Sequence, residues 1–327
     1  MSNILITSRI IGTVIKEPIK LLKEAGHNIV SNPYLGQNVT EEQIIDLIRE
    51  VDGMIVGDDH ITRNVIKNAK NLKVISKNGV GVDRIDLKAA TEYGVIVTNT
   101  PGANAEAVAD LTFGLMLCVA RQIHVADRLT KEGNFERVVG VEVWNKTIGI
   151  VGTGKIGKAV AKRAKGFNMQ LLGYDIIPDN KFAQEIGLKY VSLKNLLEQS
   201  DFVTLHAPST DQSRSMINKN TISLMKPNGY IINVARGDLI VTDDLYDALK
   251  KGKIAGAAID VWEEEPPVGN PLLTINSVVT TSHIGAFSKE AMINQCIMST
   301  KNLIKVLNRE IPKENIVNSE VLEEVSE

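Results

Sequence analysis

Short apolar runs alternate with amphipathic helical patterns along almost the whole chain, and this alternation limits the fold more than any other feature. Strands that are joined by helical crossovers lie parallel in an open sheet, with helices on both faces. We therefore expect an α/β fold made of doubly wound parallel sheets. The expected strands are Ile4–Thr7, Asn28–Val30, Gly53–Val56, Leu72–Ser76 and Val95–Thr98 in a first series, and Ile148–Val151, Gln170–Tyr174, Phe202–Leu205, Tyr230–Val234, Ala255–Ile259 and Val278–Thr281 in a second series.

The two series of strands predict two domains, because a chain of 327 residues exceeds the usual size of a single domain. Two open sheets of about five and about six strands do not share one core comfortably, so we expect a cleft between the domains. Between the two series, the region from Ala105 to about Lys131 is apolar over most of its surface, and its pattern predicts one long helix.

The charge composition argues against nucleic acid or an anionic membrane as the main partner, since the formal net charge is only −2 at pH 7. No uncharged apolar stretch reaches the roughly 18 residues of a membrane span, and the first residues resemble a strand rather than a signal peptide. Cys118 and Cys296 belong to no metal-binding pattern. We therefore expect a reduced cytoplasmic protein with no bound metal.

A glycine-rich turn, Gly152 to Gly157, joins the expected strand Ile148–Val151 to a helical segment. Glycines at this spacing allow a tight turn, the approach of a pyrophosphate to the backbone, and close packing of the helix on the strand. The free N–H groups at the start of the helix attract phosphate. The pattern predicts a dinucleotide site with phosphate contacts at Gly152, Gly154, Lys155, Ile156 and Gly157.

Asp175 ends the next expected strand, about 20 residues beyond the glycines, where a carboxylate can accept hydrogen bonds from the adenosine ribose. The same carboxylate would repel the 2′-phosphate of NADP. Ile176 and Ile177, which follow it, supply no compensating arginine. We therefore expect the cofactor to be NAD.

Three more residues that can carry chemistry follow strands of the second series, namely Arg236, Glu265 and His283. Each one alone is as consistent with a solvated charge or a buried polar group as with a functional role. Ligands of doubly wound sheets bind at the carboxyl ends of the strands, so the three residues are expected to meet there. Together they favour an acid/base histidine, its carboxylate partner and an arginine that binds an anion.

The chain resembles the D-isomer-specific 2-hydroxyacid dehydrogenase family over essentially its whole length. The motifs that carry this resemblance are Lys77–Asp83, Thr100–Gly102, Gly152–Gly157, Asn233–Gly237, Asp260–Pro266, His283–Gly285 and Asn315–Asn318. The resemblance implies an NAD-binding Rossmann domain at residues 101–285, inserted in a flavodoxin-like substrate domain that comprises residues 1–100 and 286–327. It also implies a homodimer that forms through the NAD domain.

The resemblance assigns His283 as the acid/base, Glu265 as its partner, Arg236 as the substrate clamp and Asp260 as a contact of the nicotinamide amide. It places the remaining cofactor contacts at His206, Ala207 and Pro208 near the adenosine, and at Val234, Ala235, Arg236, His283 and Gly285 around the nicotinamide. It implies that the substrate carboxylate binds to backbone N–H groups of the loop Asn78, Gly79, Val80 and Gly81.

The reaction that follows is hydride transfer between NAD(H) and C2 of a small D-2-hydroxy acid or 2-keto acid. Arg9 and Lys77 follow strands of the first series, so we expect them to bind a second anionic group of the substrate. The first choice of substrate is the dianion 3-phosphoglycerate, with its keto form 3-phosphohydroxypyruvate. Hydroxypyruvate, glyoxylate or a sulfonated analogue are the alternatives.

An NAD-sensing regulatory protein of the corepressor type is the alternative from another class, because such relatives can keep the same three site residues. A formate dehydrogenase is disfavoured, since its reaction needs no acid/base, whereas Glu265 and His283 are expected to provide one.

Overall fold

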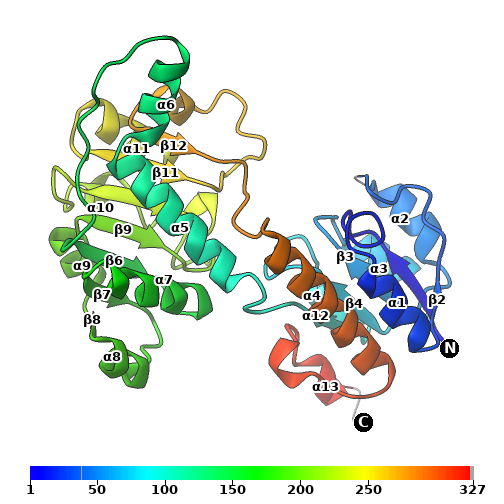
Figure 1. Cartoon of the computed structure of the whole chain (residues 1–327). Coiled ribbons are helices and arrows are strands. Elements are labelled where there is room, and N and C mark those ends of the chain that lie inside the picture. Colours follow the sequence, from blue (N-terminus) through cyan, green and yellow to red (C-terminus); the bar gives the residue numbers. More distant parts are fainter. Residues whose placement is uncertain (38, 325–327) are drawn as a thin grey trace. The chain divides into compact units, whose positions relative to one another are not determined.

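The structure, a computed structural model, describes residues 1–37 and 39–324 and divides into two compact units (Figure 1). Unit 1 comprises Met1–Asn104 and Lys289–Glu327, and unit 2 comprises Ala105–Ser288. The expected boundaries, after residues 100 and 285, fall four and three residues before the observed ones. Unit 1 is therefore built from both ends of the chain, with unit 2 inserted between them.

The sheet of unit 1 is parallel, with the strand order β2-β1-β3-β4-β5. Its elements are β1 (Asn3–Ile6), α1 (Glu17–Glu24), β2 (Asn28–Ile29), α2 (Glu41–Ile48), β3 (Gly53–Val56), α3 (Arg63–Asn68), β4 (Val74–Lys77), α4 (Leu87–Glu92), β5 (Ile96–Thr98), α12 (Lys289–Leu307) and α13 (Val321–Glu324). This strand order is that of flavodoxin-like folds. The expected α/β class with parallel sheets is confirmed.

Both faces of this sheet are covered by apolar side chains. On one face, Ile4, Ile6 and Val74 belong to the same buried cluster as Cys296 and Leu303 of α12. On the other face, the intervening strand residues pack with α2, α3 and α4. This division follows from the strand geometry, because successive side chains of a strand point to opposite faces.

The segment Asn315–Asn318 covers the edge strand β5. Val317 N donates to the Val97 carbonyl oxygen at 2.8 Å, and Val97 N donates to Asn318 Oδ1 at 2.8 Å. Asn318 Nδ2 donates to the Val95 carbonyl oxygen at 2.9 Å. An uncovered edge would leave backbone groups unpaired. The asparagine motif near the end of the chain is therefore a structural part of unit 1.

The sheet of unit 2 has seven parallel strands in the order β12-β11-β10-β9-β6-β7-β8. Its elements are α5 (Ala105–Ala120), α6 (Ile123–Lys131), β6 (Thr147–Val151), α7 (Lys155–Gly166), β7 (Gln170–Tyr174), α8 (Asn180–Ile186), β8 (Leu188–Tyr190), α9 (Leu193–Gln199), β9 (Phe202–Leu205), α10 (Lys219–Ile222), β10 (Tyr230–Asn233), α11 (Thr242–Lys250), β11 (Gly256–Ile259) and β12 (Val278–Thr280). The strand order reverses between β6 and β9, and ligands bind at the carboxyl ends of strands beside such a switch point. The sequence predicts six of these strands and misses β8, which is only three residues long.

The prediction of one long helix after Ala105 is wrong, because the chain breaks between α5 and α6. Gln122 adopts a left-handed conformation with a φ of 51°, and the two helices meet at 65°. Most of α5 is buried, whereas α6 has no buried residue. No glycine or proline marks this break, so the sequence pattern does not show it. Among the described residues, no single helix is long and apolar enough to cross a membrane, and this bent pair satisfies those two conditions only when taken together.

Candidate active site

The glycine-rich turn between β6 and α7 has close backbone contacts that only glycine permits. Gly152 has a φ of 88°, and a Cβ there would lie 2.7 Å from the nitrogen of Ala207. A Cβ at Gly157 would lie 2.1 Å from the Gly152 carbonyl oxygen. Both positions therefore require glycine. At Gly154, by contrast, no described atom lies within 4 Å of an added Cβ, so the backbone is open to an approaching group.

This turn fits the pyrophosphate of a dinucleotide. Gly154 is the N-cap residue of α7, and no described side chain caps the start of that helix. The first N–H groups of the helix and its partial positive charge are the features that bind phosphate in such turns. The residues expected to contact the phosphates, Gly152, Gly154, Lys155, Ile156 and Gly157, all lie on this turn or on the first turn of α7.

Asp175 follows β7 and is anchored to the glycine-rich turn. Its Oδ2 accepts hydrogen bonds from Thr153 N at 2.6 Å and Thr153 Oγ1 at 2.9 Å, and its Oδ1 accepts one from Ile177 N at 2.9 Å. Burial raises the pKa of Asp175, but these hydrogen bonds outweigh it and hold the pKa below its ordinary value. Asp175 is therefore an oriented carboxylate, as the proposed ribose contact requires.

Tyr190 on β8 supports this arrangement, and the sequence gives no signal for it. Its hydroxyl oxygen lies 2.7 Å from Thr153 Oγ1 and accepts a hydrogen bond from Asp179 N at 3.1 Å. Lys158 of α7 pairs with Asp179 Oδ2 at 2.5 Å. The strand that the sequence misses thus supplies a residue that positions the turn and, through it, Asp175.

The turn His206–Pro208 follows β9 and lies directly against Gly152. His206 Nε2 lies 2.9 Å from Thr204 Oγ1. Burial lowers the pKa of His206 to about 3, so the ring is neutral at physiological pH. The residues expected near the adenosine therefore border the glycine-rich turn. His206 contributes a neutral ring to this border and no charge.

The turn after β10, which holds Val234, Ala235 and Arg236, is fixed by Asn233. Asn233 Oδ1 accepts a hydrogen bond from Ala235 N at 3.1 Å, and Asn233 Nδ2 donates to the Arg236 carbonyl oxygen at 2.8 Å. Arg236 Nη1 donates to the Ala235 carbonyl oxygen at 2.7 Å. Asn233 is only 1% exposed, so it acts as an internal brace for the turn that carries the arginine.

Asp260 directly follows β11, is fully buried, and organises the next loop. Its Oδ1 accepts hydrogen bonds from Thr281 Oγ1 at 2.6 Å and Ile284 N at 2.8 Å, and its Oδ2 accepts one from Gly285 N at 3.0 Å. Its carbonyl oxygen accepts a bond from His283 N at 2.8 Å. The resemblance gives Asp260 a contact with nicotinamide, whereas the observed contacts hold the loop that carries His283.

His283 has a φ of 57°, in the left-handed region that residues other than glycine rarely adopt. Its Nδ1 lies 2.9 Å and 3.0 Å from the two carboxylate oxygens of Glu265. Trp262 N donates to Glu265 Oε1 at 3.3 Å and helps to fix that carboxylate. The His283 side chain is 49% exposed. The pair predicted from the sequence therefore forms, and Nε2 is the ring nitrogen directed away from Glu265.

In unit 1, part of the backbone of the loop after β4 is hydrogen-bonded to the sheet. Asn78 N donates to the Val56 carbonyl oxygen at 2.9 Å, so this N–H is not available for the substrate carboxylate expected there. The carbonyl oxygens of Gly79 and Val80 also accept hydrogen bonds within unit 1, which fixes the loop. The N–H groups of Gly79, Val80 and Gly81 remain as candidates for binding a carboxylate.

Arg9 and Lys77, which the sequence places at strand ends, both bind Asp58. Lys77 Nζ lies 3.1 Å from Asp58 Oδ1, and Arg9 Nη2 lies 3.5 Å from Asp58 Oδ2. Arg84 Nη1 donates to the Asp58 carbonyl oxygen at 2.8 Å. The sequence identifies two of these cations, but neither Arg84 nor the acid that they surround.

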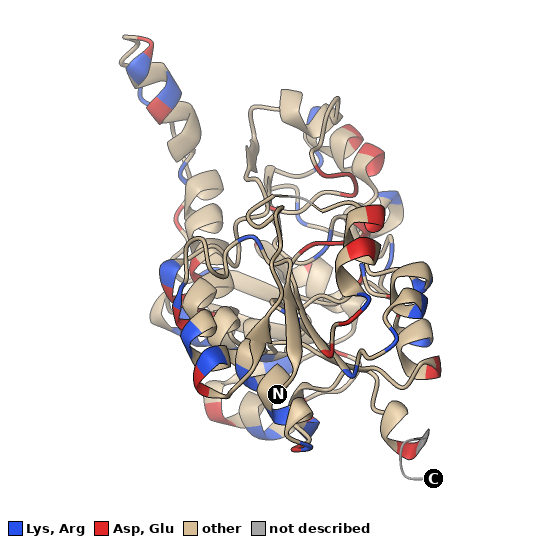
Figure 2. Ribbon diagram, turned by 90° about the vertical axis from the view of Figure 1, so that its right-hand side faces the viewer, with Lys and Arg blue, Asp and Glu red and all other residues tan. Residues whose placement is uncertain are grey.

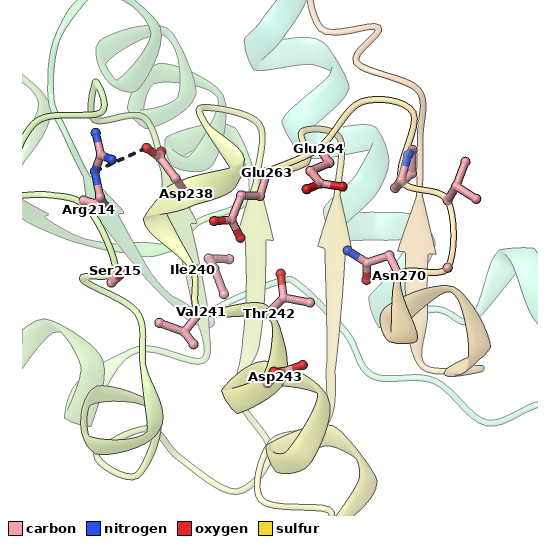
Figure 3. A pocket seen from close by; sticks show the side chains of 13 residues that line it. Arg214, Ser215, Asp238, Ile240, Val241, Thr242, Asp243, Glu263, Glu264 and Asn270 are labelled. Carbon is pink, nitrogen blue, oxygen red and sulfur yellow. Dashed lines mark ion pairs between the residues drawn. The ribbon is translucent and has the colours of Figure 1, made fainter.

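A cavity of about 480 Å³ opens between the loops that follow β10 and β11 in unit 2 (Figure 3). Figure 3 shows the ion pair between Arg214 and Asp238 at its border. The charged residues of its lining are Arg214, Asp238, Asp243, Glu263 and Glu264, so acids predominate. Neither His283 nor Glu265 belongs to this lining. Because the lining would repel a pyrophosphate or a carboxylate, we do not place the cofactor or the substrate there.

Comparison with known proteins identifies the class. The family model for the NAD-binding domain of D-isomer specific 2-hydroxyacid dehydrogenases matches residues 113–285. The D-3-phosphoglycerate dehydrogenase of Methanocaldococcus jannaschii is 43% identical over 93% of this chain, which spans 57% of that protein. The glyoxylate reductase of Thermococcus litoralis is 41% identical over 85% of this chain, which spans 87% of that relative. The D-lactate dehydrogenase of Aquifex aeolicus, solved with NAD and lactic acid, is 28% identical and has a TM-score of 0.82 over 97% of this chain and 99% of its own.

The fold and these similarities define an NAD-binding α/β oxidoreductase. The chain belongs to the D-isomer-specific 2-hydroxyacid dehydrogenase family, and the resemblance seen in its motifs is confirmed. NAD is the cofactor of unit 2, as the glycine-rich turn and Asp175 predict.

Proposed function

We propose that this chain interconverts a small D-2-hydroxy acid and its 2-keto acid with NAD(H). One observation carries the proposal: the His283–Glu265 pair is held by buried Asp260 at the carboxyl edge of an NAD-binding sheet. A histidine that is oriented by a carboxylate and half exposed is suited to exchange a proton with a substrate.

Bound NADH supplies the hydride in the reduction of a 2-keto acid. Protonated His283 donates its Nε2 proton to the oxygen on which negative charge develops. Glu265, which faces Nδ1, fixes the orientation of the ring. In the reverse direction, neutral His283 accepts the hydroxyl proton through the same nitrogen.

Arg236 and the loop after β4 orient the substrate in this proposal. A guanidinium can bind the carboxylate and the carbonyl oxygen through two parallel N–H groups, which supplies both charge and geometry. The N–H groups of Gly79, Val80 and Gly81 would add neutral donors to the substrate carboxylate. The brace that Asn233 forms on the Arg236 turn keeps that turn in place.

Glyoxylate and hydroxypyruvate are the favoured substrates, and 3-phosphohydroxypyruvate is the second candidate. The cations Arg9 and Lys77 favour a phosphorylated substrate, as does the 43% identity to a D-3-phosphoglycerate dehydrogenase. Both cations are, however, already paired with Asp58. The 41% identity to a glyoxylate reductase supports the smaller substrates.

The proposal is tested by incubating the protein with NADH and each of these three keto acids, and following the loss of NADH absorbance. We expect turnover of at least one of them. With hydroxypyruvate or 3-phosphohydroxypyruvate the product should be the D enantiomer of the hydroxy acid, whereas glyoxylate gives achiral glycolate. Tight NADH binding without turnover of any keto acid would contradict the proposed enzyme activity and favour the NAD-sensing regulatory protein instead. Production of the L enantiomer would contradict the family assignment of stereochemistry.

We also propose that the protein is a homodimer formed through unit 2. The segment from α6 to β6 carries apolar side chains that are largely exposed: Ile123 at 52%, Phe135 at 87%, Val139 at 85% and Trp144 at 54%. Figure 1 shows α6 at the margin of unit 2. Clustered exposed apolar residues are typical of protein interfaces, and a second copy of the chain is the partner that the family resemblance implies.

Light scattering coupled to gel filtration tests this assembly. We expect twice the mass of the 35.7 kDa chain for the wild type. Phe135→Asp together with Val139→Asp should give monomers, whereas Val268→Asp, at a residue that is 86% exposed outside this segment, should leave the dimer intact. A wild-type monomer, or a dimer that survives the double substitution, would contradict the proposal.

A further inference from the structure

Asp58 lies at the centre of a charged cluster at the carboxyl edge of the unit 1 sheet. Arg9 follows β1, Asp58 follows β3 and Lys77 ends β4, and these three strands are neighbours in the sheet. The carboxyl ends of parallel strands meet at one edge, which brings the three side chains together. On the helices seen in Figure 2, basic and acidic residues are interspersed. The cluster at the strand ends differs from them because several cations share one carboxylate.

The members of the cluster differ in exposure. The Lys77 side chain is 11% exposed, and its Nζ donates to the Gly57 carbonyl oxygen at 2.5 Å as well as pairing with Asp58. The Asp58 side chain is 60% exposed and that of Arg9 is 47% exposed. The lysine is therefore fixed within the protein, and the acid is the member of the pair that an approaching solute meets.

Asp58 is a carboxylate under ordinary conditions. Burial raises the pKa of Asp58, but the neighbouring Lys77, Arg9 and Arg84 outweigh it and hold the pKa below its ordinary value. The acid therefore offsets part of the positive charge at this edge at any physiological pH.

The adjacent acid, Asp59, has a different partner. Its Oδ2 accepts a hydrogen bond from Thr7 Oγ1 at 2.6 Å, which links the loop after β3 to the loop after β1. Of the two acids, Asp58 is thus the one bound to Arg9 and Lys77, and its side chain can change without loss of the Asp59 link.

We propose that Asp58 is a specificity-determining residue that disfavours substrates with a second negative charge. The inference rests on the proposed function, because it concerns the substrate of that same reaction. Asp58 acts as a positioning residue: it holds Lys77 and Arg9, so a phosphate on the substrate must compete with an internal carboxylate for both cations. A substrate that ends in hydrogen or hydroxymethyl meets no such competition. The cluster therefore selects glyoxylate and hydroxypyruvate over 3-phosphohydroxypyruvate.

Hydroxypyruvate and 3-phosphohydroxypyruvate are the matched substrates for the test, since they differ only in the phosphate. Asp58→Asn keeps the size of the side chain and removes its charge. We expect the variant to raise the ratio of kcat/KM for 3-phosphohydroxypyruvate to kcat/KM for hydroxypyruvate by at least about tenfold, mostly through a lower KM for the phosphorylated substrate.

Two further variants separate this role from general effects. Asp46 of α2 forms an exposed ion pair with Arg49, the residue that follows this helix. Asp46→Asn removes the same charge as Asp58→Asn and should leave the ratio unchanged. Asp58→Glu keeps the carboxylate and should keep the wild-type preference. A ratio that rises equally in Asp58→Asn and Asp46→Asn would overturn the inference, because the effect would then be one of net charge.

Binding measurements distinguish failure of this inference from failure of the proposed function. Calorimetric titration with 3-phosphoglycerate and with glycerate in the presence of NADH measures binding alone, because a hydroxy acid and reduced cofactor cannot exchange a hydride. Tighter binding of 3-phosphoglycerate by Asp58→Asn supports the inference even if no keto acid is reduced. An unchanged preference between the two ligands overturns it even if the protein proves to be an active dehydrogenase.

Discussion

Asp260 in unit 2 and Asp58 in unit 1 each follow a parallel strand, yet they bind different kinds of partner. Asp260 is fully buried and accepts hydrogen bonds from Thr281, Ile284 and Gly285 in one loop. Asp58 is largely exposed and pairs with the side chains of cations from neighbouring strand ends. A buried acid that binds mainly backbone N–H groups fixes the geometry of a reactive residue, whereas an exposed acid that pairs with cationic side chains can be displaced by a competing anion.

The largest expected effect concerns the residue that the Asp260 loop presents. His283→Ala should lower the rate of keto-acid reduction by at least about 100-fold, because it removes the proton donor, while NADH affinity changes by no more than a few-fold. Steady-state kinetics and fluorescence titration with NADH measure the two quantities. Near-normal turnover would show that the geometry fixed by Asp260 does not serve catalysis.

Asp260 itself should matter for both stability and rate. Asp260→Ala leaves several buried donors without an acceptor, so we expect a loss of about 3 kcal/mol in the free energy of unfolding. Urea denaturation measures this loss. If the alanine variant does not fold, Asp260→Asn, which keeps one acceptor oxygen, should fold and still turn over at least about tenfold more slowly than wild type, because the His283 loop is displaced. Wild-type stability and rate in both variants would contradict the role of the buried acid.

Cofactor choice depends on a third acid, Asp175, and gives a smaller effect. Asp175→Ser combined with Ile176→Arg should shift the preference for NADH over NADPH by at least about tenfold toward NADPH. The folded-state pKa of Asp175 lies below its ordinary value of 3.8, so the group is charged above that pH and uncharged only in stronger acid. Since the second pKa of a phosphate monoester is about 6, the wild-type preference should be constant between about pH 7 and pH 9, where both the carboxylate and the 2′-phosphate of NADPH are fully charged. If the preference for NADH decreased anywhere in this pH range, the role of the Asp175 carboxylate in cofactor choice would be contradicted.

The smallest effect is expected for stability at the exposed acid. Asp58→Ala should change the free energy of unfolding by no more than about 1 kcal/mol, because the Asp58 side chain is 60% exposed and Lys77 keeps its hydrogen bond to the Gly57 carbonyl oxygen. Parallel urea titrations of Asp58→Ala and Asp260→Ala compare the two acids directly. Equal losses of unfolding free energy would contradict the proposed difference between the two acids. A large loss in Asp58→Ala would mean that the Asp58 cluster stabilises the fold and does not yield to a competing anion.

Much of the fold could be predicted from local patterns, because strand and helix periodicity and the glycine-rich turn depend on nearby residues. The residues of the candidate site that follow strands, such as His283 and Glu265, were identified for the same reason. The break at Gln122 and the strand β8 were missed, since burial of the neighbouring segments decides both. The roles of Tyr190 and Asp58 were also missed, because their partners are distant in the sequence.

The contribution of α12 to unit 1 has a consequence for the order in which the chain folds during synthesis. Cys296 and Leu303 of α12 complete the apolar layer on one face of the sheet that holds Ile4 and Val74. The ribosome makes this helix only after all of unit 2. Until then, that face of the first sheet has no cover from α12 and is open to association with other chains. All residues of unit 2 are synthesised before α12. Unit 2 can therefore complete its fold before unit 1 does, although unit 1 begins earlier in the chain.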